Sequence, residues 1–320
     1  MKRLLRWISI ALGSLAALAI IAYAVVYGLS ERILRRTYEV PAVAISIPTD
    51  PAAIVEGRRL ATIRGCFGCH GRQVEGVVMF DQPMIGRVVA PNLTAAVRKY
   101  SDSELIGIIS HGVRPGGRSV MVMPAATYAL LTDEDVGRII AFLKSLPAAE
   151  GPGPSLSLGP LGRIGVVTGE FKTVAQLIAE TVPPPDATSE QAAHGRYLAR
   201  TICAECHGTS LRGDSNPDFT SPGLQLVAAY SPESFTQLMR AGIALGGREL
   251  KTMSPVARQR FSVLTDAEIA ALYSYLHTMP EASRNLVSAS SYAATASHLE
   301  CKTMHDSSDC VTSSLIQPTD

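Results

Sequence analysis

The chain has 320 residues, of which 47% are hydrophobic and 18% are charged, and its formal net charge is +1. This length predicts about two domains. The balanced charge excludes a highly charged disordered chain and a nucleic-acid binder that works through bulk positive charge. Residues 1–36 nevertheless carry six basic side chains and one acid, whereas the rest of the chain is mildly acidic. A basic, apolar segment therefore precedes a mildly acidic body.

Residues 7–29 contain no charged side chain. A helix of this length spans the roughly 30 Å hydrocarbon core of a bilayer. Three basic residues precede the stretch, so the positive-inside rule places this end in the cytoplasm and the body outside it. Ala22-Tyr23-Ala24 resembles a signal-peptidase site, which leaves a cleaved signal peptide as the alternative. Because the apolar stretch continues past this site, we predict an uncleaved signal-anchor over residues 1–36.

Four of the six cysteines belong to two copies of a Cys-x-x-Cys-His motif, Cys66-Phe67-Gly68-Cys69-His70 and Cys203-Ala204-Glu205-Cys206-His207. This motif is typical of covalent haem c attachment, in which two thiols bond to the porphyrin and the histidine binds its iron. A thiol redox pair does not need the histidine. A zinc site would require two distant pairs to converge. We therefore predict two covalently attached haem c groups, bonded to Cys66, Cys69, Cys203 and Cys206, with His70 and His207 as iron ligands.

The sequence around the two motifs is repeated. Three glycine or arginine positions and one methionine recur at a constant offset, so that Gly112, Gly117, Arg118 and Met123 correspond to Gly242, Gly247, Arg248 and Met253. Methionine opposite histidine gives a haem iron a raised potential. We therefore expect Met123 and Met253 to be the sixth iron ligands. Met121 and His111 are alternatives in the first repeat, although Lys251 and Ala241 replace them in the second.

Both repeats show helical patterns and no convincing strand pattern. Asp50-Pro51 predicts a helix that runs to Ala61, and Thr132 and Thr265 each begin a capping-box pattern before an amphipathic helix. Shorter helices are expected near 102–110 and 232–240. The other methionines are expected to fill the core; they are Met79, Met84, Met239, Met279 and Met304. Carbonyl groups near Pro91 and Pro222 are candidate acceptors for the second ring nitrogen of the two motif histidines.

With an early Cys-x-x-Cys-His, a methionine in a loop and a last helix ending in Leu-Pro or Met-Pro, both repeats resemble class I cytochromes c. This resemblance implies an all-α fold of two tandem cytochrome c domains, at 50–147 and 187–280, behind one N-terminal transmembrane helix. It also implies that the first helix of each domain crosses the last, bringing Gly57 near Phe142 and Gly195 near Tyr275.

Two further segments complete the chain. Residues 148–186 are rich in Gly and Pro and are predicted to be a linker that packs on the domains, with a short helix near 174–181. Residues 281–320 form a Ser/Thr-rich tail. Its Cys301 and Cys310 are expected to form a disulfide outside the cytoplasm, with a metal site as the alternative.

Taken whole, the chain is similar to membrane-anchored dihaem cytochromes that serve periplasmic dehydrogenases and oxidases. The resemblance implies a non-enzymatic electron carrier without catalytic residues, on the periplasmic side of a bacterial inner membrane. It would accept electrons from a periplasmic dehydrogenase or other donor and pass them to an oxidase or a soluble cytochrome. Two alternatives stay open: a dihaem enzyme of the peroxidase or thiosulfate-oxidising type, and a fixed cytochrome subunit of one dehydrogenase complex.

Overall fold

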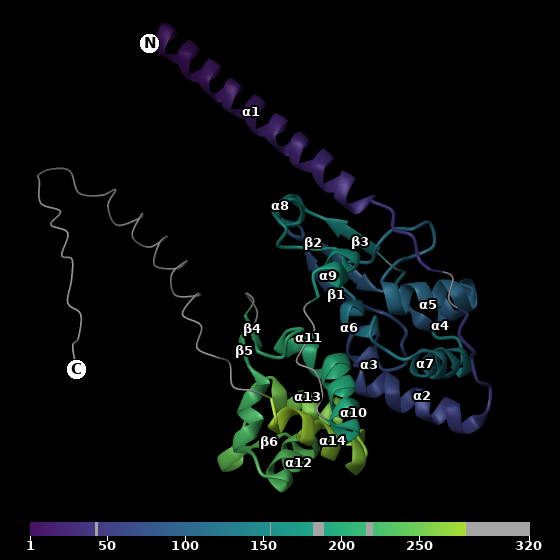
Figure 1. Cartoon of the computed structure of the whole chain (residues 1–320). Coiled ribbons are helices and arrows are strands. Elements are labelled where there is room, and N and C mark those ends of the chain that lie inside the picture. Colours follow the sequence, from purple (N-terminus) through teal and green to yellow (C-terminus); the bar gives the residue numbers. More distant parts are fainter. Residues whose placement is uncertain (42–43, 154, 182–188, 216–219, 280–320) are drawn as a thin grey trace, which may run out of the picture. The chain divides into compact units, whose positions relative to one another are not determined.

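The computed structural model describes residues 1–41, 44–153, 155–181, 189–215 and 220–279. The predictions for the tail, including the Cys301–Cys310 disulfide and the core position of Met304, lie outside these residues. The described chain is mainly helical, which confirms the predicted fold class (Figure 1). Three small antiparallel sheets accompany the helices. No pattern in the sequence predicted these sheets.

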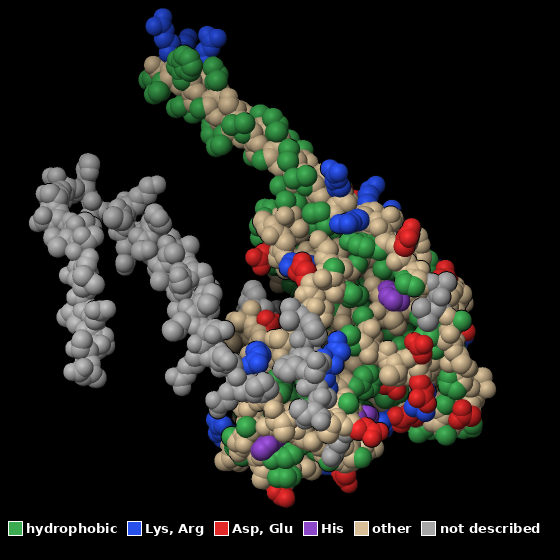
Figure 2. Space-filling view, in the orientation of Figure 1, with side chains coloured by type: hydrophobic (Ala, Val, Ile, Leu, Met, Phe, Trp, Pro, Cys, Tyr) green, Lys and Arg blue, Asp and Glu red, His purple; other side chains and the backbone are tan. Residues whose placement is uncertain are grey.

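The N-terminal segment is one continuous helix, α1 (Lys2–Leu34). It is long and apolar enough to cross a membrane, with a mean hydropathy of 2.3 in its most apolar part. Its large apolar side chains, such as Trp7 and Ile20, are exposed (Figure 2). A membrane anchor and a signal sequence share these properties, and either one takes the helix into a bilayer.

The first module, defined as residues 50–147, contains α2 (Pro51–Ile63), α3 (Cys66–His70), α4 (Leu93–Lys99), α5 (Asp102–His111), α6 (Ala125–Tyr128) and α7 (Asp133–Ser145). The Asp50 side chain accepts a hydrogen bond from the Ala53 N–H, and Pro51 occupies the first turn, as predicted. α2 crosses α7 at Gly57, where an added Cβ would lie 2.0 Å from the Arg138 carbonyl oxygen and 2.9 Å from Phe142 Cβ. The predicted approach of Gly57 to Phe142 is confirmed.

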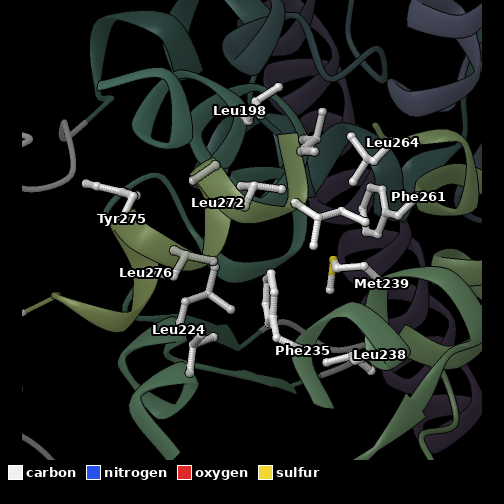
Figure 3. Packing of buried hydrophobic residues seen from close by; sticks show 14 of the residues in the cluster. Leu198, Leu224, Phe235, Leu238, Met239, Phe261, Leu264, Leu272, Tyr275 and Leu276 are labelled. Atoms are coloured by element: carbon white, nitrogen blue, oxygen red, sulfur yellow. The ribbon is translucent and has the colours of Figure 1, made fainter. Parts of the chain in front are cut away.

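The second module, defined as residues 187–280, repeats this arrangement with α10 (Glu190–Leu198), η1 (Ala199–Cys203), α11 (Ala204–His207), η2 (Leu224–Ala229), α12 (Pro232–Ala241), η3 (Leu245–Gly247), α13 (Met253–Arg260), η4 (Phe261–Val263) and α14 (Asp266–His277). α10 crosses α14 at Gly195, where an added Cβ would lie 1.9 Å from the Ala271 carbonyl oxygen and 2.9 Å from Tyr275 Cβ. The predicted contact with Tyr275 is confirmed. Figure 3 shows the apolar side chains that fill this module, among them Phe235 and Leu272.

The repeated glycine loops share one backbone arrangement. α5 and α12 both end on a glycine in the left-handed conformation, Gly112 at φ 62° and Gly242 at φ 73°. The residues that follow pair with a second segment at equivalent positions. These pairs are Val113 with Ser119 in the first module, and Ile243 with Glu249, in strands β6 (Ile243–Ala244) and β7 (Arg248–Glu249), in the second. The offset found in the sequence therefore reflects a structural repeat.

The linker has more regular structure than predicted. Its strand β3 (Ser155–Leu158) pairs with β2 (Gly86–Ala90), which pairs with β1 (Val77–Gln82). Two helices follow, α8 (Pro160–Thr168) and α9 (Val174–Ala179). α9 confirms the short helix expected near 174–181. A second hairpin, β4 (Gly213–Ser215) with β5 (Thr220–Pro222), follows the second motif. β4 and β5 have three residues each, and the longer β1 does not alternate polar and apolar side chains, so pairing reveals strands that the sequence pattern does not.

The methionines outside the repeated loop differ in how far they are buried. Met239 and Met279 are buried, as expected. The prediction of a core position is wrong for Met79 and Met84, which are exposed. Both belong to the β1–β2 hairpin, which the sequence did not reveal: Met79 lies in β1, a strand exposed over nearly its whole length, and Met84 lies in the turn that follows.

Candidate functional site

The first Cys-x-x-Cys-His motif forms the one-turn helix α3. It follows a sharp break after α2, where Gly65 adopts φ 76°. Burial raises the pKa of the Cys66 thiol to about 11 and also raises the pKa of Cys69. A redox-active thiol pair needs the opposite shift, because the thiolate is the reactive form.

The second motif is reached without a break. From Gly195 to Cys203 the chain is one residue shorter than from Gly57 to Cys66, and the π-helical turn η1 leads directly into α11. Burial raises the pKa of Cys203 to about 12. All four motif cysteines are free of disulfides. Within the described ranges no cluster of three or more His, Cys, Asp or Glu could itself hold a metal ion, which argues against a zinc site formed by the two pairs.

Both motif histidines are oriented by a proline carbonyl. His70 Nδ1 lies 2.8 Å from the Pro91 oxygen, and His207 Nδ1 lies 2.8 Å from the Pro222 oxygen. These are the carbonyls proposed from the sequence. Burial lowers the pKa of both imidazoles and outweighs the opposing effect of the hydrogen bond to the carbonyl. With Nδ1 as the donor, a neutral ring keeps the Nε2 lone pair for a metal, which is the form needed to bind haem iron.

Met123 lies in the turn before α6, and the linker supports its loop. The Val174 N–H, at the start of α9, donates to the Val120 carbonyl at 3.0 Å. The next N–H, of Ala175, donates to Ser119 Oγ at 3.0 Å. The linker helix therefore fixes the backbone that carries Met123. The role of Met123 as an iron ligand stays a prediction.

Met253 is the first residue of α13 and packs partly against the core of its module. The fully buried Ser254 hydroxyl accepts from the Leu250 N–H at 2.7 Å and donates to the Gly242 carbonyl. In the first module the Ser119 hydroxyl lies 3.3 Å from the corresponding carbonyl, that of Gly112. Serines at different positions thus tie each methionine loop to the end of the preceding helix. Like Met123, Met253 stays a predicted ligand.

One arginine of the second module contacts the second motif and the segment that precedes the first motif. Arg260 Nε donates to the Ile63 carbonyl at 3.0 Å, and Nη1 donates to Glu205 Oε2 at 3.0 Å. Glu205 lies between Cys203 and Cys206. On the other side, a Cβ added to Gly65, the residue before Cys66, would lie 2.7 Å from Arg260 Cζ. The positive charge of Arg260 partly opposes the effect of burial on all four cysteine pKa values.

A second arginine, Arg64, is buried where the modules meet, with 1% of its surface exposed. Its Nη2 donates to Asp135 Oδ2 at 2.9 Å and lies 3.2 Å from the Tyr197 hydroxyl. The Tyr197 hydroxyl of the second module donates to the same Asp135 oxygen at 2.5 Å. Asp135 therefore does not complete the capping box expected after Thr132, although Thr132 accepts from its N–H. Arg64 Nε and Nη1 are buried without a hydrogen-bond partner among the described residues.

Further contacts hold the modules together. Arg59 of α2 donates to both carboxylate oxygens of Glu268 in α14, at 2.7 and 2.9 Å. Ile63, at the end of α2, is fully buried within the apolar cluster of the second module. Sequence reasoning missed these residues. The available signal is a difference in length between the repeats: the stretch from Ala61 to Cys66, which contains Arg64, is one residue longer than its counterpart, and the stretch from Met253 to Leu264, which contains Arg260, is three residues longer than its counterpart.

Comparison with known proteins agrees with these two sites. The cytochrome c family model matches residues 54–147 and 192–280. The chain is also 23% identical over 269 residues to the fructose dehydrogenase cytochrome subunit of Gluconobacter japonicus. The aligned region covers 73% of this chain and 55% of that protein, so the chain spans about half the length of this curated relative.

Proposed function

The chain belongs to the cytochrome c family, and on this basis we propose that it binds two haem c groups, one in each module, and carries electrons between proteins. Cys66 and Cys69 would bond to one haem, and Cys203 and Cys206 to the other. His70 and His207 would bind the two irons, with Met123 and Met253 as further ligands. Each haem c would supply an iron that takes up and releases one electron.

The observation that supports this proposal most strongly is that Arg260 connects the second motif, through Glu205, to Ile63 in the segment that leads into the first motif. This connection across the module boundary supports electron transfer from one module to the other within the same chain. Arg64 and Arg260 lie beside the motifs, where each guanidinium is paired with a carboxylate, that of Asp135 and that of Glu205. Positive charge favours the reduced form of a nearby redox centre, because reduction adds a negative charge.

We propose a periplasmic dehydrogenase as the donor and an oxidase or a soluble cytochrome as the acceptor. The similarity to a dehydrogenase cytochrome subunit supports the choice of donor. The same similarity favours a second candidate, in which the chain is a fixed subunit of one dehydrogenase complex. The two candidates differ in the partner interface, since a transient redox contact buries less than about 1,200 Å² and a permanent subunit contact buries more.

We propose that α1 is an uncleaved anchor in the bacterial inner membrane and that both modules lie on the periplasmic side. The length and exposed apolar surface of α1 support a membrane helix, and the basic residues that precede its apolar stretch support the periplasmic orientation. Intact-mass measurement of the protein from native membranes tests both the anchor and the cofactor. The expected mass is that of the whole chain plus two haem groups. A mass starting after Ala24 would overturn the anchor, and a mass with fewer than two haems would overturn the dihaem assignment.

Capture from mildly solubilised membranes distinguishes a carrier from a subunit. A dehydrogenase recovered in a 1:1 ratio identifies a fixed subunit, whereas recovery of the dihaem protein by itself identifies a carrier. Carbon monoxide binding tests the methionine ligands and the enzyme alternative. The reduced wild-type protein is expected not to bind it, whereas Met123→Ala and Met253→Ala should each open one iron. Binding by the wild type would favour the enzyme alternative.

A further inference from the structure

The linker helix α8 is attached to the end of α1. Arg163 of α8 is buried, and its Nη1 donates to Ser30 Oγ at 2.8 Å and to Glu31 Oε1 at 2.9 Å. The same guanidinium lies over the Tyr27 ring, with Cζ 3.9 Å from the ring centroid. Ser30 is the one fully buried residue of α1, which the structure describes throughout. These contacts fix α8 at the point where the uncharged stretch of α1 ends.

The solvent-exposed side of α8 is apolar in its first half and ends on the polar Thr168. Leu161 and Ile164 are separated by one helical turn and are 50% and 44% exposed. Met84, in the β1–β2 turn, is 55% exposed, and its carbonyl accepts from the Leu161 N–H at 2.8 Å. Phe171, 42% exposed, follows α8 and contacts it at Gly165. We name these four residues the apolar foot: Met84, Leu161, Ile164 and Phe171. In Figure 2 hydrophobic side chains continue from α1 onto the adjoining surface of the body.

Positive charge accompanies this apolar surface. Arg32, Arg35 and Arg36 are exposed at the same end of α1. Single exposed apolar residues are ordinary, but a group of neighbouring ones beside a membrane helix marks a surface that lipid or another protein covers. Apolar side chains flanked by arginines match the boundary between acyl chains and anionic headgroups. At this boundary the apolar side chains are buried among the acyl chains, and the arginines bind the headgroup phosphates.

We propose that the apolar foot rests in the headgroup–acyl boundary of an anionic bilayer, so that α1 and α8 together hold the two modules in a fixed orientation above the membrane. The proposal rests on the anchoring role of α1 proposed above. The Arg163 contacts with Ser30 and Glu31 connect the foot to the anchor, because they prevent α1 from rotating independently of α8. The linker is joined to the first module by the β2–β3 pairing and by α9, so the orientation of the first module follows that of α8.

The experiment uses the full-length holoprotein in nanodiscs of phosphatidylethanolamine and phosphatidylglycerol. In a C301S/C310S background, a spin label is attached at Ile164→Cys or, as the matched control, at Val55→Cys. Val55 is also an exposed apolar residue on a helix, but it belongs to α2 of the first module. Relaxation by oxygen, which concentrates in lipid, is compared with relaxation by a water-soluble nickel complex. We expect the oxygen-to-nickel ratio at residue 164 to be several-fold higher than at residue 55.

The outcomes separate this proposal from the anchor on which it rests. Failure of the protein to float with vesicles of the same lipids would overturn the anchoring role of α1. Flotation with equal ratios at residues 164 and 55 would overturn the apolar foot and leave the anchor intact. A label at residue 164 that becomes shielded only after a dehydrogenase is added would show that a protein covers this surface, and it would also overturn the proposal.

Discussion

Replacing Gly57 with alanine tests the crossing of α2 and α7, which positions the first motif. The new methyl group would lie 2.0 Å from the Arg138 carbonyl oxygen, against an ordinary contact of 3.4–4 Å. Because the obstacle is backbone, the helices must separate by more than 1 Å. Overpacking of this kind costs about 1–3 kcal/mol, and a contact this close belongs at the upper end of that range. Alanine regains about 1 kcal/mol through its higher helix propensity.

The expected net loss in the free energy of unfolding is therefore about 2 kcal/mol, or roughly 8–16 °C in the melting temperature of a module of this size. Hydrogen exchange measured by mass spectrometry on the holoprotein resolves the two modules. Faster exchange is expected in α2 and α7 and not in α10 and α14, and Gly195→Ala should give the reverse pattern.

Gly68→Ala is the matched control for Gly57→Ala. An added Cβ at Gly68 meets no atom within 4 Å, and Glu205 occupies the equivalent position in the second motif. Its effect is expected to stay within about 0.5 kcal/mol. If Gly57→Ala were as stable as the wild type, with unchanged exchange in α2 and α7, the argument that a glycine is required at the crossing would be refuted.

Three more predictions concern the contacts between and within the modules. Burial of the Glu268 carboxylate favours its neutral form, but hydrogen bonds from Arg59 and from the Thr265 N–H outweigh this effect and lower its pKa below 4.5. The stabilisation by this ion pair is therefore present above pH 4.5 and is lost as the pH falls through the lowered pKa of Glu268. Glu268→Gln should flatten this part of an acid-unfolding curve. An unchanged curve would contradict the assignment. Arg260→Gln should lower both haem potentials in a redox titration. The expected decrease is at most roughly 70 mV for a charge on the order of 10 Å away at an effective dielectric constant of about 20. Arg258→Gln, on the exposed side of the same helix, should leave both potentials unchanged. Ser254→Ala should increase carbon monoxide binding at the second haem only, and equal binding to the wild type would show that the hydroxyl does not hold the methionine loop.

The sequence by itself predicted the chemistry of the two sites. Attachment of haem c depends on spacing within five residues, and that spacing is visible without a fold. The internal repeat located the methionine loops and the proline carbonyls opposite the motif histidines, because both copies preserve the offsets along the chain. Helix periodicity and the Asp50-Pro51 start gave α2, and the resemblance to class I cytochromes c correctly placed Gly57 and Gly195 at helix crossings.

Tertiary structure decided what lies between and beside the two sites. Arg260 reaches Ile63, which lies 197 residues earlier in the chain, and Tyr197 of the second module bonds to Asp135 of the first. No local pattern encodes such contacts, since they depend on which faces of the two modules meet. That choice follows from residues in which the repeats differ, such as Arg64 and Arg260. The pairing of β3 with β2 and the attachment of α8 to α1 were hidden for the same physical reason: short segments acquire a defined structure only through the partner that completes their hydrogen bonds and covers their side chains.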